Sequence, residues 1–204
     1  MSFDIDVRRT LGETEIACRV EPGAGVTVLF GPSGAGKSSV LNMVAGLLRP
    51  DAGHIRVGER TLFDAATGVD LKPEARRAGY VFQEPRLFPH LRARANLLYG
   101  WRKGAAVDVD GVIALLGIAP LLDRWPRTLS GGEAKRVAIG RALLTDPDFL
   151  LLDEPLASLD RARREEILAL LERLRDGIGL PILLVTHDRA EAERLGDRIV
   201  AFGE

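Results

Sequence analysis

One segment of the sequence combines closely spaced glycines, a lysine and serines in a pattern suited to binding phosphate. It reads Gly31-Pro32-Ser33-Gly34-Ala35-Gly36-Lys37-Ser38, followed by Ser39, and fits G-x-x-x-x-G-K-[ST] throughout. Glycines let backbone N–H groups close on a phosphate, lysine adds a full positive charge, and a serine hydroxyl is a hard ligand for Mg²⁺. An apolar run precedes the loop and a helical pattern follows it, so a helix N-terminus would also face the anion. The segment therefore predicts a nucleoside triphosphate site rather than a plain glycine-rich turn.

Two adjacent acids end a second apolar run, Phe149-Leu150-Leu151-Leu152-Asp153-Glu154. The carboxyl ends of parallel strands are where ligands bind in open α/β sheets. Because neighbouring strand residues point in opposite directions, the two carboxylates would have different tasks. Asp153 would help to hold Mg²⁺, directly or through water, and Glu154 would act on an attacking water as general base or orienter. The alternative is a strand end that runs into solvent, with both acids present for solubility.

A second candidate anion site is the start of a helical run over residues 134–144, which is preceded by Ser130-Gly131-Gly132-Glu133. Ser130 and Glu133 form a capping box, which needs no ligand. Each glycine costs about 0.5–1 kcal/mol relative to alanine in a helix, which suggests that another molecule approaches this backbone. The chain thus has two such helix starts and the fingerprint of one nucleotide site. One resolution is a head-to-tail dimer, in which each ATP lies between the lysine loop of one chain and Ser130-Gly131-Gly132 of the other.

The elements that must position these residues alternate between strand and helix, except for a mainly helical stretch in the middle. The strands are expected at residues 2–7, 14–20, 26–30, 54–57, 60–63, 79–82, 149–152, 181–185 and 198–202. Helices are expected at residues 38–48, 161–175 and 189–195, besides those of the stretch from about 85 to 148. This order predicts an α/β fold of the P-loop NTPase kind. A mostly parallel sheet would be covered by helices, with an N-terminal antiparallel β subdomain and a helical insertion.

Length and composition indicate one ordinary globular domain. The chain has 204 residues, of which 46% are hydrophobic and 28% charged, and its net charge of −1 argues against broad electrostatic binding to nucleic acid or anionic lipid. We expect a single nucleotide-binding domain over residues 1–204, with the helical subdomain at about 85–148 and no C-terminal regulatory domain. Cys18, the only cysteine, is expected to be a small packed residue. The longest apolar stretch, residues 112–122, is too short to span a membrane, so we expect a soluble, cytoplasmic chain that meets a membrane only through a partner.

Taken together and in order, these motifs resemble those of the ATP-binding-cassette ATPases, and the resemblance covers essentially the whole chain. It implies that Ser130, Gly131 and Gly132 contact the γ-phosphate across a dimer. Three further residues match the family pattern. They are Gln83 after the strand at 79–82, Asp160 in Ser158-Leu159-Asp160, and His187 in Val185-Thr186-His187-Asp188.

The roles that this resemblance implies for the three added residues differ. Gln83 would touch Mg²⁺ and the water and link the helical insertion to the core, Asp160 would communicate across the dimer, and His187 would contact the γ-phosphate. Each also has a plainer explanation: a surface glutamine, the N-cap of the helix at 161–175, and a turn residue before a capping-box pattern at Asp188. His54 and His90 have no partner pattern and are left as non-catalytic.

The finer resemblance is to the ATPases of importers, and among these to those of molybdate importers. It rests on residues 79–83, 86–90, 96–100, 115–118, 121–124, 136–144 and 155–160. It implies ATP and Mg²⁺ as ligands, integral membrane permease subunits as direct partners, and a solute-binding protein as an indirect one. The expected location is the cytoplasmic face of the inner membrane, where the chain would be held peripherally by the permease. Uptake of another solute (sulfate, a sugar, an amino acid or a metal) is the alternative.

Three departures from the family pattern bear on function. Many members carry a tyrosine after the first strand that stacks on adenine, whereas residues 7–11 hold no aromatic side chain. Base stacking would then be weak or come from Leu11, and selectivity for adenine would be less secure. The signature continues Glu133-Ala134-Lys135-Arg136, where similar proteins more often carry a glutamine. Molybdate-type ATPases usually continue into an oxyanion-binding regulatory domain, which these 204 residues do not include.

Four other function classes fit less well. A soluble cassette ATPase of repair or translation commonly carries two cassettes or long insertions, and a small-molecule P-loop kinase has no need of Ser130-Gly131-Gly132. A GTPase is disfavoured because the sequence has no N-K-x-D motif, and a non-catalytic regulatory partner would not need Glu154 and His187. We therefore expect an ATPase motor. ATP would close the dimer, hydrolysis would reopen it, and the helical insertion would pass the motion to membrane subunits.

Overall fold

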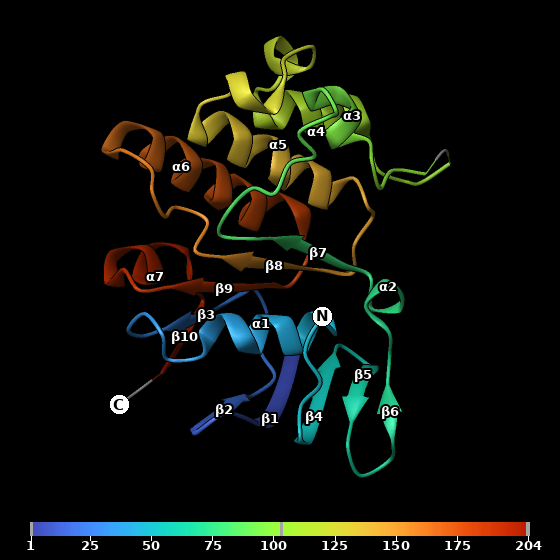
Figure 1. Ribbon diagram of the computed structural model, residues 1–204, viewed down its shortest axis with the longest axis vertical. Helices are drawn as coiled ribbons and strands as arrows, with labels where there is room; N and C mark the ends of the chain where they lie inside the picture. Colours follow the sequence, from blue (N-terminus) through green and yellow to red (C-terminus); the bar gives the residue numbers. More distant parts are fainter. Residues whose placement is uncertain (1, 103, 203–204) are drawn as a thin grey trace.

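Two five-stranded sheets organise the computed structural model, which describes residues 2–102 and 104–202 (Figure 1). The first sheet is antiparallel, in the order β2-β1-β4-β5-β6. The second is parallel, in the order β10-β3-β9-β8-β7. The strands are β1 (Phe3–Leu11), β2 (Thr14–Val20), β3 (Val26–Phe30), β4 (Ala52–Val57), β5 (Arg60–Asp64), β6 (Val69–Asp70), β7 (Ala78–Val81), β8 (Phe149–Asp153), β9 (Ile182–Thr186) and β10 (Arg198–Ala201). The predicted fold class is confirmed.

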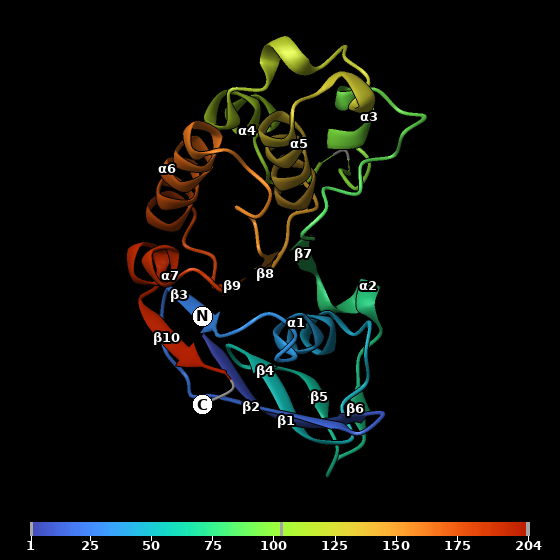
Figure 2. The ribbon, with the colours of Figure 1, turned by 60° about the vertical axis from the view of Figure 1, so that its left-hand side comes forward.

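Both faces of the central strands β3, β8 and β9 are buried, as their continuous apolar runs predict, whereas the edge strand β10 is partly exposed. Alternate residues of β8 show this most clearly. Phe149 and Leu151 join the core around α1 (Lys37–Ala45), which lies between the two sheets in Figures 1 and 2. Leu150 and Leu152 join a second core with α6 (Arg161–Ile178) and α7 (Arg189–Leu195). Cys18 is buried in the first core, as expected, and burial raises the pKa of its thiol to about 12.

The helical part packs on the second core and lies apart from the antiparallel sheet (Figure 2). It consists of α3 (Ala93–Leu97), α4 (Val109–Leu116), the short 3₁₀ helices η1 (Ala119–Leu121) and η2 (Pro126–Thr128), and α5 (Gly131–Leu143). Gly140 lets these helices approach closely, because a Cβ there would lie 2.5 Å from Leu97 Cδ1 and 2.7 Å from Leu116 Cδ1. Within the described residues, no helix combines the length and the apolar character that a membrane span requires.

The element boundaries differ from the sequence-based expectation at several places. The expected helix over residues 38–48 ends at Ala45, because Gly46 adopts a left-handed conformation (φ 80°) and its N–H bonds back to the helix. The first strand continues past residue 7 to Leu11, because β2 pairs with it along that length, down to Leu11 opposite Thr14. The helix expected at 161–175 runs on to Ile178. Strand β6 and the one-turn helix α2 (Pro73–Arg76) were not expected, and both are too short to give a periodic pattern.

The end of α1 depends on a buried arginine that α2 supplies. Arg76 is 1% exposed, and its guanidinium donates to the carbonyls of Met43 (2.7 Å) and Val44 (3.1 Å). It also donates to Leu71 O at 2.7 Å and to Asp70 Oδ1 at 3.0 Å. These bonds satisfy carbonyls that a helix end leaves without partners inside the helix. Arg76 therefore holds the helix of the phosphate-loop region against the segment that leads into β7.

Replacing Arg76 tests this attachment. Arg76→Leu removes the donor to Val44 O and Leu71 O and one of the two donors to Met43 O, so we expect it to lower the free energy of unfolding by about 2–4 kcal/mol, measured by urea denaturation followed by circular dichroism. The matched control is Arg49→Leu, because Arg49 pairs with the same Asp70 (3.3 Å) while its side chain is 72% exposed. The control should change stability by no more than about 0.5 kcal/mol. Equal effects of the two substitutions would contradict the assignment.

Candidate functional site

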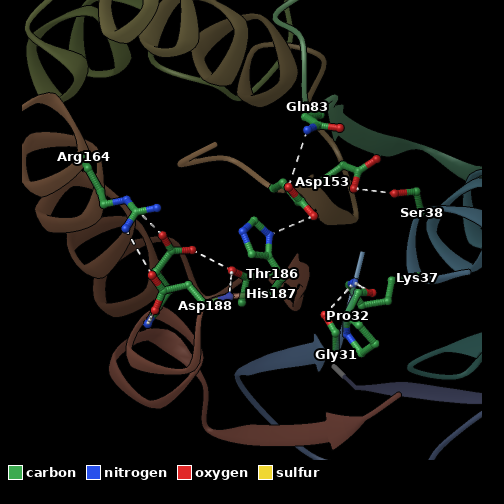
Figure 3. A network of polar contacts seen from close by, with 12 residues as sticks. Gly31, Pro32, Lys37, Ser38, Gln83, Asp153, Arg164, Thr186, His187 and Asp188 are labelled. Carbon is green, nitrogen blue, oxygen red and sulfur yellow. Dashed lines mark hydrogen bonds and ion pairs between the residues drawn. The ribbon is translucent and has the colours of Figure 1, made fainter. Parts of the chain in front are cut away.

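Four adjacent strands of the parallel sheet end at one edge, and each leads into a segment with candidate site residues (Figure 3). The phosphate loop follows β3, His187 follows β9, and Gln83 follows β7. Asp153 is the last residue of β8, and Glu154 comes next. Because parallel strands bring their carboxyl ends together, residues far apart in sequence become neighbours there.

The phosphate loop wraps around its own lysine. Gly34 and Gly36 have φ angles of 85° and 92°, a backbone conformation that glycine adopts without strain. Lys37 is 4% exposed, and its Nζ donates to Gly31 O (2.8 Å) and Pro32 O (2.7 Å). Burial lowers the pKa of Lys37, and the nearby carboxylates of Glu154 and Asp153 oppose that shift. A charged donor thus sits where the loop meets the N-terminus of α1.

Ser38 and Asp153 form an oxygen pair beside the loop. Ser38 Oγ donates to Asp153 Oδ1 at 2.8 Å, which ties the first turn of α1 to the end of β8. Asp153 is 7% exposed, and burial raises its pKa while the bond from Ser38 lowers it. A hydroxyl and a carboxylate oxygen are ligands that Mg²⁺ prefers. Two of the three residues predicted to hold Mg²⁺ are therefore in direct contact.

Glu154 diverges from Asp153 for a reason other than the expected strand alternation. Glu154 lies outside β8 and has a φ of 41°, which is unusual for a residue with a Cβ. Its N–H donates to Val185 O at 3.0 Å, and its carbonyl accepts from Ala157 N at 3.1 Å. A left-handed turn fixed by these two bonds therefore aims the Glu154 side chain, at a conformational cost of about 1–3 kcal/mol.

The carboxylate of Glu154 lies between the two other predicted catalytic residues. Its Oε1 is 3.2 Å from His187 Nδ1, and its Oε2 is 3.5 Å from Gln83 Nε2. The Glu154 side chain is 14% exposed and that of His187 is 48% exposed, so a solvent molecule can approach them from one side. The segments after β7, β8 and β9 thus converge on one carboxylate.

A polar network that the sequence did not reveal flanks His187 along the chain, and two of its members, Thr186 and Glu191, are buried. Thr186 Oγ1 donates to Glu191 Oε2 (2.6 Å) and accepts from Asp188 N (3.1 Å). Arg164 of α6 reaches Asp188 Oδ2 (3.1 Å) and Glu191 Oε1 (3.3 Å), as Figure 3 shows for its labelled members. Burial raises the pKa of Glu191, and its bond from Thr186 acts in the opposite direction.

The capping box expected after His187 is only half formed. Asp188 does accept from the N–H groups of Ala190 and Glu191, but the Glu191 side chain binds Thr186 instead of the helix start. The spacing of Glu191 could have predicted that it is buried. It lies four residues before Leu195, so the two share a helix face, and Leu195 is buried.

The start of α5 has the predicted capping box. Ser130 Oγ accepts from Glu133 N at 3.3 Å, and Ser130 N donates to Glu133 Oε2 at 2.6 Å, a bond that lowers the pKa of Glu133. A Cβ on Gly131 would lie 3.3 Å from Leu159 Cδ2, and one on Gly132 would lie 3.5 Å from Arg163 Cβ. Neither position is closed to a side chain by its own chain. Intrachain packing therefore does not account for the two glycines.

The remaining candidates lie at helix starts and not at the sheet edge. Asp160 caps α6, as its plainer explanation predicted, by accepting from Arg163 N at 3.1 Å. A pocket of about 920 Å³ connects the two regions, with Ser38, Asp153 and Gly131 all in its lining. Leu11, 38% exposed, lines the same pocket, and its contact with a base stays a prediction.

Lys135 is a further residue of this pocket that the sequence analysis did not single out as a site residue. It is 2% exposed, and burial lowers its pKa to about 8 while the charge of Asp153 opposes the shift. Its position four residues before Ile139 and seven before Ala142, both buried, places it on the apolar face of α5. A lysine on the apolar face of a helix is unusual, and this position could have marked Lys135 as a candidate from the sequence.

Comparison with known proteins identifies both a matching family and individual relatives of this chain. The ABC transporter family profile matches residues 14–157. The molybdenum import ATP-binding protein ModC of Rhodospirillum rubrum is 55% identical over 206 residues, which cover 99% of this chain and 56% of that protein. The protein of the same name from Mannheimia succiniciproducens is 49% identical over 205 residues, or 100% of this chain and 58% of that protein. The chain thus spans little more than half the length of these relatives.

Solved structures show the same fold. The protein cbiO1 from Clostridium perfringens, described as part of the ABC transporter complex cbiONQ, aligns with a TM-score of 0.81 at 26% identity, over 98% of this chain and 84% of that one. The dimeric post-hydrolysis state of the ATP-binding cassette MJ0796, bound to ADP and Pi, aligns with a TM-score of 0.75 at 28% identity, over 98% and 93%. By its sequence and by its fold, this chain belongs to the ABC transporter family.

Proposed function

We propose that the chain is an ATP-hydrolysing nucleotide-binding domain that drives an ABC importer of molybdate. The observation that carries the proposal is Glu154, held between His187 Nδ1 and Gln83 Nε2 next to the Ser38–Asp153 pair. In support, relatives that are 49–55% identical over almost the whole chain are named molybdenum import ATP-binding proteins. Uptake of another solute (sulfate, a sugar, an amino acid or a metal) is the alternative.

The phosphate loop would hold the triphosphate. Its backbone N–H groups and the N-terminus of α1 attract the anion, and the residues involved are Gly31, Pro32, Ser33, Gly34, Ala35, Gly36, Lys37, Ser38 and Ser39. On binding, Lys37 Nζ would exchange its two loop carbonyls for β- and γ-phosphate oxygens. The charge that burial had disfavoured then gains a strong partner.

The oxygen ligands around Ser38 fit a magnesium ion. Ser38 Oγ and Asp153 Oδ1 are 2.8 Å apart, and Gln83 lines the same pocket with an amide oxygen to offer. These residues would hold Mg²⁺, and when bound the ion would neutralise phosphate charge during transfer. Asp153 must be ionised for this role, and a nearby cation favours that form against the effect of burial.

Glu154 would take the proton of the attacking water. The water oxygen forms a bond to the γ-phosphorus, the bond from that phosphorus to the β–γ bridging oxygen breaks, and the water proton passes to a Glu154 carboxylate oxygen. His187, 3.2 Å from Oε1, and Gln83, 3.5 Å from Oε2, would fix the carboxylate and orient the water. The left-handed backbone of Glu154 keeps its carboxylate in place before the substrate arrives.

A second copy of the chain would complete the site. Ser130, Gly131 and Gly132 leave helix N–H groups open to a second anion, and the dimeric state of the MJ0796 cassette supports an assembly of two such chains. Asp160, at the exposed start of α6, would meet the partner copy. ATP then stabilises the closed dimer because only the closed form contacts the γ-phosphate from both sides.

The helical part would connect this motor to an integral membrane permease. A groove of about 380 Å³ lies between β7 and α5, and Phe82, Phe88 and Tyr99 line it. Tyr99 is 64% exposed, which is unusual for a large aromatic side chain on a groove wall. We infer that an apolar segment of the permease docks there and holds the chain at the cytoplasmic face of the membrane, with a solute-binding protein as an indirect partner. No nucleic acid partner is proposed, given a net charge of −1.

The first test separates nucleotide binding from turnover. Glu154→Gln removes the proton acceptor but keeps the shape of the side chain, so phosphate release should fall by at least about 100-fold while the affinity for fluorescent ATP stays within about twofold. Lys37→Ala, the comparison variant, should lose nucleotide affinity as well. Unchanged phosphate release by Glu154→Gln would remove Glu154 from its role.

The second test addresses the two-chain site. In saturating Mg·ATP the Glu154→Gln protein traps its substrate, so sedimentation should show a dimer that reverts to monomer when ATP is removed. Adding Lys37→Ala to the same chain should keep it monomeric, because the nucleotide that bridges the two copies is lost. A Glu154→Gln protein that stays monomeric at high concentration contradicts the head-to-tail arrangement.

The third test addresses the solute. In a bacterium that lacks its own molybdate-transport ATPase, the chain with its cognate permease and solute-binding protein should restore uptake of radiolabelled molybdate, and the Glu154→Gln chain should not. Excess unlabelled molybdate should compete at least about tenfold better than sulfate. Equal competition by sulfate would replace molybdate by a broader oxyanion specificity.

A further inference from the structure

Two basic side chains of α5 bind the segment that carries Gln83. Lys135 Nζ donates to Gln83 O at 2.7 Å and to Phe82 O at 3.3 Å. At the far end of the same segment, Arg141 donates to Pro85 O at 3.0 Å and to Arg86 O at 2.9 Å. One helix therefore holds carbonyls at both ends of residues 82–86.

The two anchors are spaced along α5 in a way that fixes the segment firmly. Six residues separate Lys135 from Arg141, which places the anchors about 9 Å apart along the helix axis. Two anchors at that separation oppose rotation as well as translation of the segment against α5. Arg141 is steadied in turn by its guanidinium, which lies 5.4 Å from the ring centroid of Phe88.

Burial shows that the Lys135 contact is more than a surface bond. Lys135 is 2% exposed and lies on the apolar face of α5, where an uncharged side chain of similar length would pack without loss of hydration. An ammonium group in that place needs oxygen partners, and the carbonyls of Phe82 and Gln83 provide them. The charge thus favours one placement of this segment against α5.

The placement of this segment determines the contact between Gln83 and Glu154, which is at the limit of hydrogen-bond distance. Gln83 Nε2 is 3.5 Å from Glu154 Oε2, whereas a good N–H···O hydrogen bond is about 2.9 Å. A shift of the segment by a few tenths of an ångström strengthens or breaks it. Helix α5 begins at Ser130-Gly131-Gly132, so a shift of its N-terminus is carried to Lys135 within about one turn.

We propose that Lys135 and Arg141 are positioning residues that clamp residues 82–86 to α5, so that the placement of α5 sets the distance from Gln83 to Glu154. The clamp acts through backbone carbonyls and rests on the proposed roles of Gln83 and Glu154 in ATP hydrolysis. In the dimer, a second chain's nucleotide bound at the start of α5 would draw Gln83 toward Glu154. Each site would then sense whether the other chain is in place.

The experiment compares Lys135→Met and Arg141→Met with the wild-type chain in amide hydrogen exchange and in ATP turnover. We expect exchange of residues 82–88 to rise about tenfold and kcat to fall about tenfold, while KM stays within about twofold. Lys135→Arg should restore most of kcat. Lys135→Gln, which keeps one donor, serves where the methionine variant does not fold, and its kcat should lie between the two.

The matched control is Arg92→Met. Arg92 is a basic residue of the same helical part that donates to a backbone carbonyl, that of Asp123, and stacks on Trp125, but it does not hold residues 82–86. In the Arg92→Met variant, amide hydrogen exchange of residues 82–88 and kcat should equal the wild-type values. An equal loss in Arg92→Met would reduce the effect to general loosening of the helical part and overturn the clamp.

A double-mutant cycle distinguishes positioning from stability. In a Gln83→Ala chain, Lys135→Met should lower kcat no further, because the side chain that it positions is gone. If Lys135→Met lowers kcat by the same factor in the Gln83→Ala chain as in the wild-type chain, the proposal is overturned. If the wild-type chain hydrolyses no ATP, the proposed function and the clamp both fail. If the wild-type chain does and Lys135→Met matches it in kcat and exchange, the clamp alone fails.

Discussion

Burial of both faces of the central strands of the parallel sheet is the constraint on which the site depends. In β8, Phe149 and Leu151 pack toward α1 while Leu150 and Leu152 pack toward the helical part, so the strand can neither slip by one residue nor turn over. With the register fixed, Asp153 arrives at the sheet edge beside Ser38. The neighbouring strands are held in the same way, and the loops after β3, β7 and β9 therefore start from fixed points. Side chains from four distant parts of the sequence can then meet within hydrogen-bond distance of each other.

That edge holds two adjacent carboxylates beside a lysine, and the backbone keeps the two carboxylates apart. Asp153 and Glu154 are adjacent in sequence, and both exert a field on Lys37. The left-handed conformation of Glu154 sends its side chain toward His187 and Gln83, while Asp153 stays with Ser38. One carboxylate thereby stays beside Ser38, and the other lies between His187 and Gln83, as the proposed metal-binding and proton-accepting roles would require. Strain at a single residue thus separates two side chains that strand alternation does not separate here, because Glu154 lies outside the strand.

The sequence indicated which candidate residues would lie together at the sheet edge, but it did not reveal the contacts that hold them there. Apolar runs marked β3, β8 and β9, and glycine spacing marked the phosphate loop, because both signals are local and periodic. The support is not local: 52 residues separate Lys135 from Gln83, and 24 separate Arg164 from Asp188. Arg76 likewise serves α1 from more than 30 residues away. A period shows which face of a helix is buried, but not which carbonyl a buried cation will find, so such partners emerged only from the fold. The end of α1 was misplaced for a related reason, since the left-handed turn at Gly46 interrupts a run whose apolar pattern continues.

The helical part is inserted in the chain between two neighbouring strands, β7 and β8, and this insertion gives the proposed motion a route to the site. The chain leaves the sheet at the carboxyl end of β7 through residues 82–86 and returns at the amino end of β8, and these two strands are neighbours. The return is tied to the core, because Asp148 pairs with Arg60 (2.7 Å) and Arg77 (3.1 Å) and its N–H donates to Arg77 O. The exit is tied to α5 through Lys135 and Arg141. The partly exposed ion pairs at the return are individually weak, at about 1 kcal/mol or less, but they act together with a backbone bond. A rotation of the helical part would therefore pivot near Asp148 and displace the exit, and the first side chain displaced would be Gln83, at 3.5 Å from Glu154.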